Sequence, residues 1–337
     1  MSERAAAGEQ AAGRSVAVCL TVLNEAASID ELLASLAAQT RQPAEIVVAD
    51  GGSTDGTLDA LERWRARGLP LTMLDRPGVN ISTGRNAAIG ASAAPVVAVT
   101  DAGVRLHRDW LARITAPFAG VDPPDVVAGF FEPDPRSTFE LALGATTLPV
   151  VTEICPAAFL PSSRSAAFAR AAWERVGGYP EWLDYCEDLV FDLALKASGC
   201  RFAWAPGAVV RFRPRPTPRA FFVQYYRYAR GDGKADLWRR RHAIRYATYL
   251  GLPLALRVAR RRPWLLGPIL LAAGAYVRRP YARLLPALGT LPPRERAAAI
   301  AWVPVIRLIG DVAKMLGYPA GLAWRARHRA GLPPRAR

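Results

Sequence analysis

Acidic side chains stand directly after two apolar runs in the first third of the chain. Asp50 follows the run Glu45–Ala49, and Asp101 follows the run Val96–Thr100. Short β-branched runs of this kind are typical of strands buried in a parallel sheet. Ligands of open α/β sheets bind at the carboxyl ends of the strands, where one or two carboxylates can help to hold a cation. The sequence therefore predicts a polar ligand site at this edge.

Two strand–turn–helix units position these acids. Val16–Val22 is the first expected strand, and a capping box from Ser28 to Glu31 is expected to open the helix after it. The second unit continues from its strand through a glycine-rich turn over Asp50–Asp55 into a helix that reaches Trp64. Further elements are expected at Leu71–Leu74 (strand), Ser82–Ala91 (helix), Asp125–Gly129, Gly199–Trp204 and Ala208–Phe212 (strands). The pattern predicts an α/β fold with an open sheet flanked by helices.

The ends of the first two strands resemble the nucleotide-sugar glycosyltransferases of family 2, which have the GT-A fold. The matching segments are Thr21…Asn24-Glu25 and Asp50-Gly51-Gly52-Ser53-Thr54-Asp55-Gly56-Thr57. The resemblance covers roughly residues 15–235 and implies a GT-A type nucleotide-binding sheet. It assigns donor binding to four residues, which in the family hold the uridine: Thr21, Asn24, Glu25 and Asp50. For Asp55, turn chemistry is an equally good interpretation, since Asp is common in such loops.

The resemblance also implies residues for the diphosphate. Gly84-Arg85-Asn86 resembles the family's Arg-Asn segment, so Arg85 is expected to contact the base or the phosphates, with a solvated arginine as the alternative. Family members usually end the fourth strand in Asp-x-Asp, which binds the diphosphate through a divalent cation. Here the segment is Asp101-Ala102-Gly103, and the second carboxylate is missing. Asp101 alone predicts a weak, exchangeable Mg²⁺ or Mn²⁺, because such ions need few protein carboxylates.

A second departure adds to the doubt about a metal. Many family members place a His after a late strand, where this chain has Val209-Val210-Arg211-Phe212. Fixed cations can stabilise a departing phosphate group in place of a metal. Arg85, Arg164 and Arg227 are therefore candidates for carrying part of the leaving-group charge.

A Gly-Gly-Tyr segment followed by two acids indicates the general base. Gly177-Gly178-Tyr179 and then Glu187-Asp188 resemble the family segment whose acid deprotonates the acceptor. The resemblance implies Asp188 as the base and Glu187 as the second choice. The alternative is that both acids only complement the dipole of the helix that they begin. Within that helix, Asp192 and Lys196 are placed to pair at i,i+4.

One further motif lies after the two acids. Gln224-Tyr225-Tyr226-Arg227-Tyr228 resembles the Gln-x-x-Arg-Trp element of membrane-linked family members. The resemblance implies that Gln224 and Arg227 face the diphosphate and that Tyr228 stacks on the acceptor sugar. A helix whose aromatic side chains simply pack is the alternative.

Charge is distributed unevenly along the chain of 337 residues. Residues 1–200 carry a net charge of −9 and residues 201–337 carry +24, which together make the overall +15. Nucleic-acid readers carry their positive charge on a recognition motif, and none is evident, so no nucleic-acid partner is expected. Basic side chains interleaved with apolar segments suit an anionic membrane surface instead.

Two segments of the basic part indicate a peripheral or shallow membrane contact. Pro263–Val277 is uncharged for 15 residues, fewer than the ~20 needed to span a bilayer. Val305–Met315 places apolar side chains on one helical face and Arg307, Asp311 and Lys314 on the other. An ordinary helical subdomain packed on the catalytic core is the alternative.

These features predict three regions: a disordered leader over 1–14, a GT-A glycosyltransferase domain over 15–235 and a basic, apolar helical region over 236–337. Cysteines are scattered without metal-binding spacing, which indicates reduced thiols in a cytosolic setting; they are Cys19, Cys155, Cys186 and Cys200.

The expected function is an inverting transfer of a sugar from a nucleotide-sugar donor, UDP-linked, to a lipid-linked or envelope glycan acceptor at the cytoplasmic face of the cell membrane. Inversion follows because one base and no covalent nucleophile are evident. A nucleotidyltransferase is one alternative, but it would need a glycine-rich loop with a Lys or Arg after the first strand. A non-catalytic binding module is another: Gly103 and Phe212 favour it, and Glu187-Asp188 opposes it.

Overall fold

The computed structural model describes residues 15–328, so the leader expected at residues 1–14 lies outside the described residues. The chain forms two compact units. The first contains the residues up to Glu132 together with Val151–Phe212, and the second contains Pro133–Val150 together with the chain from Arg213 onward. The Gln-x-x-Arg-Tyr segment therefore belongs to the second unit, with the basic part of the chain.

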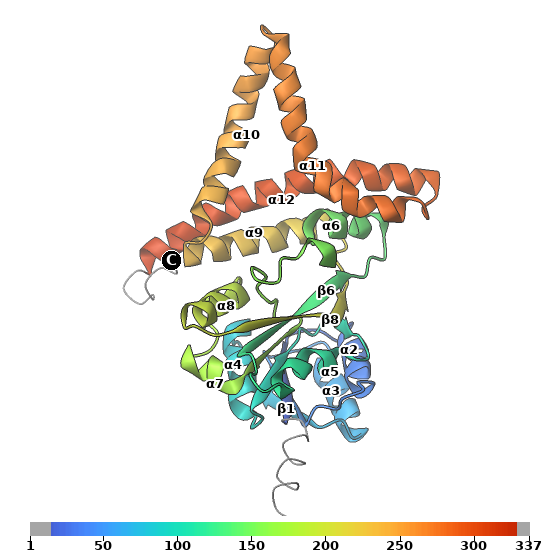
Figure 1. Cartoon of the computed structure of the whole chain (residues 1–337), viewed down its shortest axis with the longest axis vertical. Helices are drawn as coiled ribbons and strands as arrows, with labels where there is room; N and C mark the ends of the chain where they lie inside the picture. Colours follow the sequence, from blue (N-terminus) through green and yellow to red (C-terminus); the bar gives the residue numbers. More distant parts are fainter. Residues whose placement is uncertain (1–14, 329–337) are drawn as a thin grey trace, which may run out of the picture. The chain divides into compact units, whose positions relative to one another are not determined.

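An eight-stranded sheet forms the centre of the first unit, in the order β3-β2-β1-β4-β7-β6-β8-β5 among the described residues (Figure 1). Strand β1 pairs in parallel with β2 and β4, and β2 pairs in parallel with β3. Strand β7 is antiparallel to β4 and β6, and β5 is antiparallel to β8. The strands are β1 (Val16–Val22), β2 (Glu45–Asp50), β3 (Leu71–Asp75), β4 (Val96–Val99), β5 (Val104–Leu106), β6 (Val126–Pro133), β7 (Ala166–Ala169) and β8 (Phe202–Phe212).

Helices lie on both faces of this sheet (Figure 1). Val18 and Leu20 of β1 pack with side chains of α2, α3 and α5, while Ala17 and Cys19 pack with α4, α7 and α8. Side chains alternate along a strand, so the unbroken apolar run of β1 is buried on both faces. The helices are α2 (Ile29–Ala37), α3 (Thr57–Ala66), α4 (Ile81–Ala91), α5 (Trp110–Thr115), η1 (Ala116–Ala119), η2 (Val151–Glu153), α7 (Arg170–Arg175) and α8 (Glu187–Ala197). The predicted open α/β sheet flanked by helices is confirmed.

Two local predictions are wrong. Helix α2 begins at Ile29 as expected, but the Ser28 hydroxyl does not cap it and instead donates to the Glu25 carboxylate at 2.6 Å. The two late strands are one, because β8 runs through Pro206 and Gly207 without a turn. The backbone there is extended, and a Cβ at Gly207 would lie 2.6 Å from the Arg113 guanidinium.

The second unit is helical, and its helices α9 and α12 approach each other closely. A Cβ at Gly317 would overlap the carbonyl oxygen of Tyr226, and one at Gly321 would overlap that of Arg230. No helix among residues 15–328 is both long enough and apolar enough to cross a membrane. The helices are α6 (Thr138–Thr147), α9 (Pro218–Ala235), α10 (Arg239–Ala259), η3 (Pro263–Leu265), α11 (Leu266–Leu288) and α12 (Pro293–Arg327).

Helix α12 turns part of its charged face inward. Asp311 is buried, and its carboxylate accepts hydrogen bonds from Arg245 and Tyr249 of α10 and from Tyr276 of α11. Apolar side chains of the opposite face, Leu308 among them, are exposed to solvent. Helical periodicity shows which residues share a face but does not show whether that face meets water or other helices. Here the buried carboxylate of Asp311 is compensated by three hydrogen-bond donors from two helices.

Close packing of α9 on α12 gives a stability prediction. Gly321→Val should lower the free energy of unfolding by about 1–3 kcal/mol, because the added side chain forces two backbones apart. Gly274→Val is the matched control: it also lies inside a helix, but a Cβ there has no atom within 4 Å. Urea unfolding followed by far-UV circular dichroism measures both, and equal effects of the two substitutions would contradict the packing.

Candidate functional site

Asn24 joins the loops that follow β1 and β2. Its side-chain oxygen accepts the N–H of Thr54 at 2.9 Å, and its own N–H donates to the Ser53 hydroxyl at 2.9 Å. The backbone of Asn24 is left-handed, with φ of 57°, a conformation that Asn tolerates better than most residues. Asn24, which was expected to bind the donor, thus shapes the edge formed by the loops after β1 and β2. We call this edge the rim, and Thr21, Glu25, Asp50 and Asp55 also lie on it.

Asp50 is the best-supported candidate for holding the nucleotide base. It is buried, and its Oδ2 accepts the N–H groups of Gly52 and Ser53 at 2.9 Å each. Its Oδ1 is also buried and has no partner among the described residues. A buried polar atom without a partner is costly and rare, so it marks a place where a ligand N–H fits.

The remaining candidates on this rim have mainly local partners. Thr21 packs against the first turn of α4, where a Cβ at Gly84 would lie 2.7 Å from its methyl group. Glu25 accepts from Ser28 and donates its N–H to the Thr57 hydroxyl at 2.8 Å. Asp55 bonds to Thr57 and to the N–H of Ala26. Turn chemistry accounts for Asp55, one of the two interpretations left open for it.

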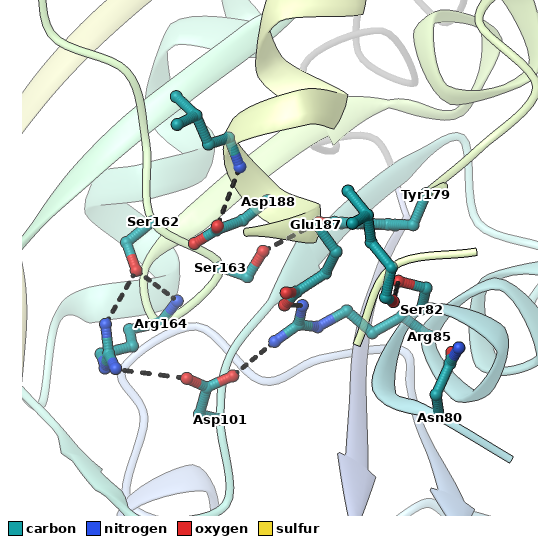
Figure 2. Close-up of polar contacts among 12 residues, drawn as sticks. Asn80, Ser82, Arg85, Asp101, Ser162, Ser163, Arg164, Tyr179, Glu187 and Asp188 are labelled. Atoms are coloured by element: carbon teal, nitrogen blue, oxygen red, sulfur yellow. Dashed lines mark hydrogen bonds and ion pairs between the residues drawn. The ribbon is translucent and has the colours of Figure 1, made fainter. Parts of the chain in front are cut away.

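Arg85 lies at the centre of the second group of candidates. Its guanidinium is buried and donates to Glu187 at 2.6 Å and to Asp101 at 2.7 Å (Figure 2). Burial by itself lowers the pKa of Arg85, but Asp101 and Glu187 raise it overall, so the side chain is charged. The solvated alternative is wrong, because Arg85 is buried and bridges the end of β4 and the start of α8.

The Gly-Gly-Tyr segment is fastened to the same helix α4 that carries Arg85. Asn86 accepts the N–H of Tyr179 at 2.8 Å and donates to its carbonyl oxygen at 2.9 Å. Gly178 has φ of 79°, and a Cβ there would lie 2.6 Å from the Asn86 side chain. The Tyr179 ring then stacks on Phe191 of α8, with centroids 4.1 Å apart. These contacts explain why Gly-Arg-Asn and Gly-Gly-Tyr occur together: both position α8.

Three acids of α8 differ in exposure and in ionisation. Burial, and then the nearby Asp188, raise the pKa of Glu187 to about 7 against the opposing effect of Arg85. Asp188 is half-buried, and its Oδ1 accepts the N–H of Leu189 at 2.8 Å. Asp192 is buried, which raises its pKa well above the ordinary value, and it does not form the predicted pair with the exposed Lys196. Asp188 is therefore the acid of this helix that a substrate can reach most easily.

Asp101 lies between two guanidinium groups (Figure 2). Its second oxygen is 3.7 Å from Nε of Arg164, whose guanidinium lies over the ring of Phe212 at 4.8 Å. Ser162, which no sequence motif singles out, accepts from Arg164 at 3.2 Å. Phe212 ends the segment in which the resemblance led us to look for a His, and its ring packs against the Arg164 guanidinium.

A tightly held divalent cation does not fit the residues around Asp101. Both of its oxygens face arginines, and Gly103 brings no second carboxylate. Among residues 15–328, no group of three His, Cys, Asp or Glu side chains is arranged to hold a metal ion. The donor set matches a carboxylate that positions arginines rather than one that binds a metal.

The structure thus brings together five of the predicted residues around one buried guanidinium: Arg85, Asp101, Arg164, Glu187 and Asp188. The rim residues follow β1 and β2 in the same unit. Gln224, Arg227 and Tyr228 lie in the second unit, on α9, where Gln224 donates to the Tyr228 hydroxyl at 3.0 Å.

The raised pKa of Glu187 gives a pH prediction. The folded protein binds a proton at Glu187 up to about pH 7, whereas an ordinary glutamate releases it near 4.5. The folded state therefore binds more protons in this window, and wild type loses free energy of unfolding as pH rises through it. Glu187→Gln cannot titrate, so from pH 5 to pH 8 its stability should improve relative to wild type by roughly 1–3 kcal/mol.

Urea unfolding at a series of pH values measures this difference. Glu62→Gln is the control, because Glu62 is exposed and pairs only with the neighbouring Arg65, and its curve should run parallel to wild type. A Glu187→Gln curve that also runs parallel to wild type would refute the raised pKa.

Known proteins resemble this chain in sequence and in fold. The family described as "Glycosyl transferase family 2" matches residues 17–154. The succinoglycan biosynthesis protein ExoA of Rhizobium meliloti is 28% identical over 270 residues, which are 71% of this chain and 74% of that protein. A validoxylamine A glucosyltransferase of Streptomyces hygroscopicus subsp. jinggangensis is 32% identical over 126 residues, 36% of this chain and only 30% of that relative.

A solved structure shares the fold. The mannosyltransferase PcManGT from Pyrobaculum calidifontis, in complex with GDP-Man and Mn²⁺, aligns with a TM-score of 0.54 at 22% identity, covering 94% of this chain and 88% of its own. At this identity the likeness concerns the fold, and that fold is GT-A. Residues 17–154 therefore match glycosyl transferase family 2, and the protein is a glycosyltransferase.

Proposed function

We propose that this enzyme transfers a sugar from a UDP-linked donor to a lipid-linked or envelope glycan acceptor, with inversion at the anomeric carbon. The observation that carries the proposal is the Arg85 bridge, which ties Asp101 to the helix start at Glu187 and Asp188. The bridge would hold the site of the leaving diphosphate, near Asp101, at a fixed distance from the proposed base, near the start of α8. The name of the relative ExoA, a succinoglycan biosynthesis protein, supports a polysaccharide acceptor.

The donor's base would lie against the rim after β1 and β2. The free Oδ1 of Asp50 suits the imide N–H of uracil, and an ionised carboxylate makes such a bond stronger than a neutral acceptor does. Thr21, Asn24 and Glu25 would complete this end of the site. This acceptor is the basis for proposing a UDP-linked donor.

The transfer itself is a single in-line displacement. Asp188 accepts the proton of the acceptor hydroxyl as that oxygen forms its bond to the anomeric carbon. The bond from this carbon to the diphosphate breaks at the same time, and the diphosphate leaves with the electron pair. Asp188 is the proposed base because it is the more accessible of the paired acids, while Glu187 is buried against Arg85.

Arginines would stabilise the departing diphosphate. The Arg164 guanidinium is fixed by Asp101, Ser162 and the Phe212 ring, so little reorganisation is needed when charge develops beside it. Arg85 is a positioning residue in this scheme, because its guanidinium is buried between two carboxylates. Arg227 and Gln224 of α9 are proposed to meet the diphosphate, and Tyr228 the acceptor sugar.

The basic helical unit is proposed to keep the enzyme at the cytoplasmic face of the cell membrane, against anionic lipid. Lipid-linked acceptors are found at that surface, and a membrane-held enzyme would meet them in two dimensions. Clustered arginines beside exposed leucines, such as Arg257 beside Leu254, support this location.

Substituting the base should separate chemistry from binding. Asp188→Asn should lower kcat by about 10²–10⁴-fold and leave UDP affinity nearly unchanged, because a general base acts in the transition state. Asp50→Asn should instead weaken UDP binding by roughly 10–100-fold, as expected for a lost bond to a charged group. Steady-state kinetics and calorimetry with UDP measure the two effects.

Near-normal turnover of Asp188→Asn, or a loss of UDP affinity as large as in Asp50→Asn, would overturn the assignment. Glu187→Gln is the neighbouring comparison. If it proved the more damaging to kcat with UDP binding intact, the base would be Glu187 and the reaction scheme would stand.

The metal requirement gives a separate prediction. Excess chelator should leave the UDP affinity of the wild type nearly unchanged. Asp101→Asn, which removes the carboxylate that pairs with both arginines, should impair turnover more than Gly103→Asp does. Gly103→Asp has room for its side chain, and by restoring the second carboxylate it should make UDP binding respond to Mn²⁺. Gly90→Asp, on the exposed face of α4, controls for charge alone. A wild type that binds UDP only with Mn²⁺ would contradict the arginine scheme.

A further inference from the structure

Helices α10 and α11 form a hairpin whose middle segments are apolar and exposed, although the base of α11 packs on α6 and α12. The arms meet at η3 and diverge toward α12 (Figure 1). In α10 only His242 and Ala259 are buried, and in α11 only Pro280 and Leu284. Between these points the chain contains the uncharged stretches 246–256 and 263–277. A helix that is apolar and exposed needs an apolar environment, because water penalises such surface.

The exposed leucines are spread around each arm rather than along one face. Leu250 is 72% exposed and Leu252, on the opposite side of the helix, is 39% exposed. On α11, Leu270 and Leu271 are 69% and 76% exposed and point about 100° apart. A protein partner laid along one face would leave the other leucines in water. A surrounding fluid medium of acyl chains covers all of them.

Charge identifies the kind of lipid surface. Between Asp236 and Glu295 the sequence has twelve arginines and no acidic residue. They gather at the turn of the hairpin, as Arg260, Arg261 and Arg262, and near its base, as Arg278 and Arg279. Arginines at the boundary of apolar segments are attracted to anionic headgroups and reach them with their long side chains.

The same arginines determine how the hairpin lies. If its tip pointed into the bilayer, Arg260, Arg261 and Arg262 would enter the hydrocarbon, which is costly for each of them. The longer uncharged stretch, 15 residues, rises only about 22 Å as a helix, against a hydrocarbon core of about 30 Å. A hairpin lying in the plane of the leaflet satisfies both constraints, with leucines below the headgroups and arginines among them.

The base of the hairpin is held firmly enough to present it. Asp311 of α12 accepts from Arg245 at 2.8 Å and Tyr249 at 2.9 Å on one arm and from Tyr276 on the other. These polar groups point away from the proposed lipid, toward α12, while the leucines point outward. The arms are thereby fixed elements of the helical unit and differ from a flexible basic tail.

We infer that the α10–α11 hairpin is a monotopic anchor that lies in the plane of an anionic lipid leaflet, its leucines at the level of the acyl chains and its end arginines at the level of the phosphates. The inference rests on the membrane location in the proposed function. It adds the α10 arm to the contact and the in-plane orientation of the hairpin.

Depth measurements on the full chain test this anchor. Cysteines are introduced one at a time at Leu250, Leu271 and Arg261 and carry an environment-sensitive fluorophore, and Val121→Cys in the first unit is the exposed control. The background is Cys155→Ser with Cys186→Ser, which leaves only the buried Cys19 and Cys200. The vesicles are phosphatidylcholine, with or without about one third phosphatidylglycerol. We expect quenchers on the acyl chains to reach positions 250 and 271, headgroup quenchers to reach position 261, and neither to affect position 121.

A charge substitution provides the second measurement. Leu270→Glu with Leu271→Glu should lower the vesicle partition coefficient by at least about tenfold, while Leu58→Glu, exposed in the first unit, should leave it unchanged. UDP binding by calorimetry should be the same in all variants. If the wild type does not bind UDP, the proposed donor is wrong, whereas the proposed anchor is unaffected.

Three results would overturn the anchor. Deepest quenching at position 261 means insertion by the tip. No response to anionic vesicles at positions 250 and 271 means that lipid does not cover the hairpin. The third result is a fluorescence change without any vesicles present, while sedimentation shows a dimer. That result means that a second copy of the chain covers the hairpin.

Discussion

One buried guanidinium organises the catalytic unit. Arg85 is removed from water and remains charged, so it must be surrounded by carboxylates, and a buried pair broken on one side typically costs about 3–5 kcal/mol. Its partners are Asp101, which follows the central strand β4, and Glu187, which begins α8. Helix α4, the end of β4 and the start of α8 are separate segments of the chain. The charge of Arg85 is compensated only when these three segments lie in this one arrangement. The candidate base is accurately placed because the alternative positions leave a charge unpaired.

The neighbouring motifs reinforce the same geometry. Gly178 allows its left-handed turn to approach Asn86, and Tyr179 passes from that turn to stack on α8. Cys186 lies directly before the two acids and has φ of 64°. This left-handed conformation is unfavourable for most residues other than glycine, and such strain is common at functional sites. Asp192 of the same helix is buried, which raises the pKa of its carboxyl well above the ordinary value. The left-handed Cys186 and the buried Asp192 each carry a local cost, and they lie on either side of Asp188 in the sequence.

The helical unit reverses the usual arrangement of polarity. Asp311 and its arginine and tyrosine partners lie among the helices, while leucines of α10 and α11 face outward. In water this arrangement exposes apolar surface and buries charge, and both are unfavourable. It is favourable where the exterior is lipid, because the polar groups then satisfy one another away from it. The distribution of polarity thus connects the fold of this unit with the proposed place of the reaction.

The sequence by itself determined most of the sheet and singled out the candidate site residues. Apolar runs such as Val16–Val22, ended by turn residues, are local signals, and β1 and β2 have the predicted bounds within one residue. The short strands β5 and β7 were missed, since three or four residues carry too little periodicity. Motif spacing was also sufficient to single out Asp50, Asp101 and Asp188, because each follows a segment whose residue types are distinctive on their own.

Only the tertiary structure decided what these side chains do to one another. Asp192 was expected to pair with Lys196 on the surface and is buried, and Asp311 was assigned to a charged face and lies inside. Arg85 was expected to contact the base or the phosphates or to be solvated, and the structure shows that it is buried and joins two carboxylates. Burial and charge pairing depend on which distant segments meet, and helical periodicity describes only which residues share a face. The sequence therefore identifies the residue types at the site, whereas their ionisation and their partners are set by packing.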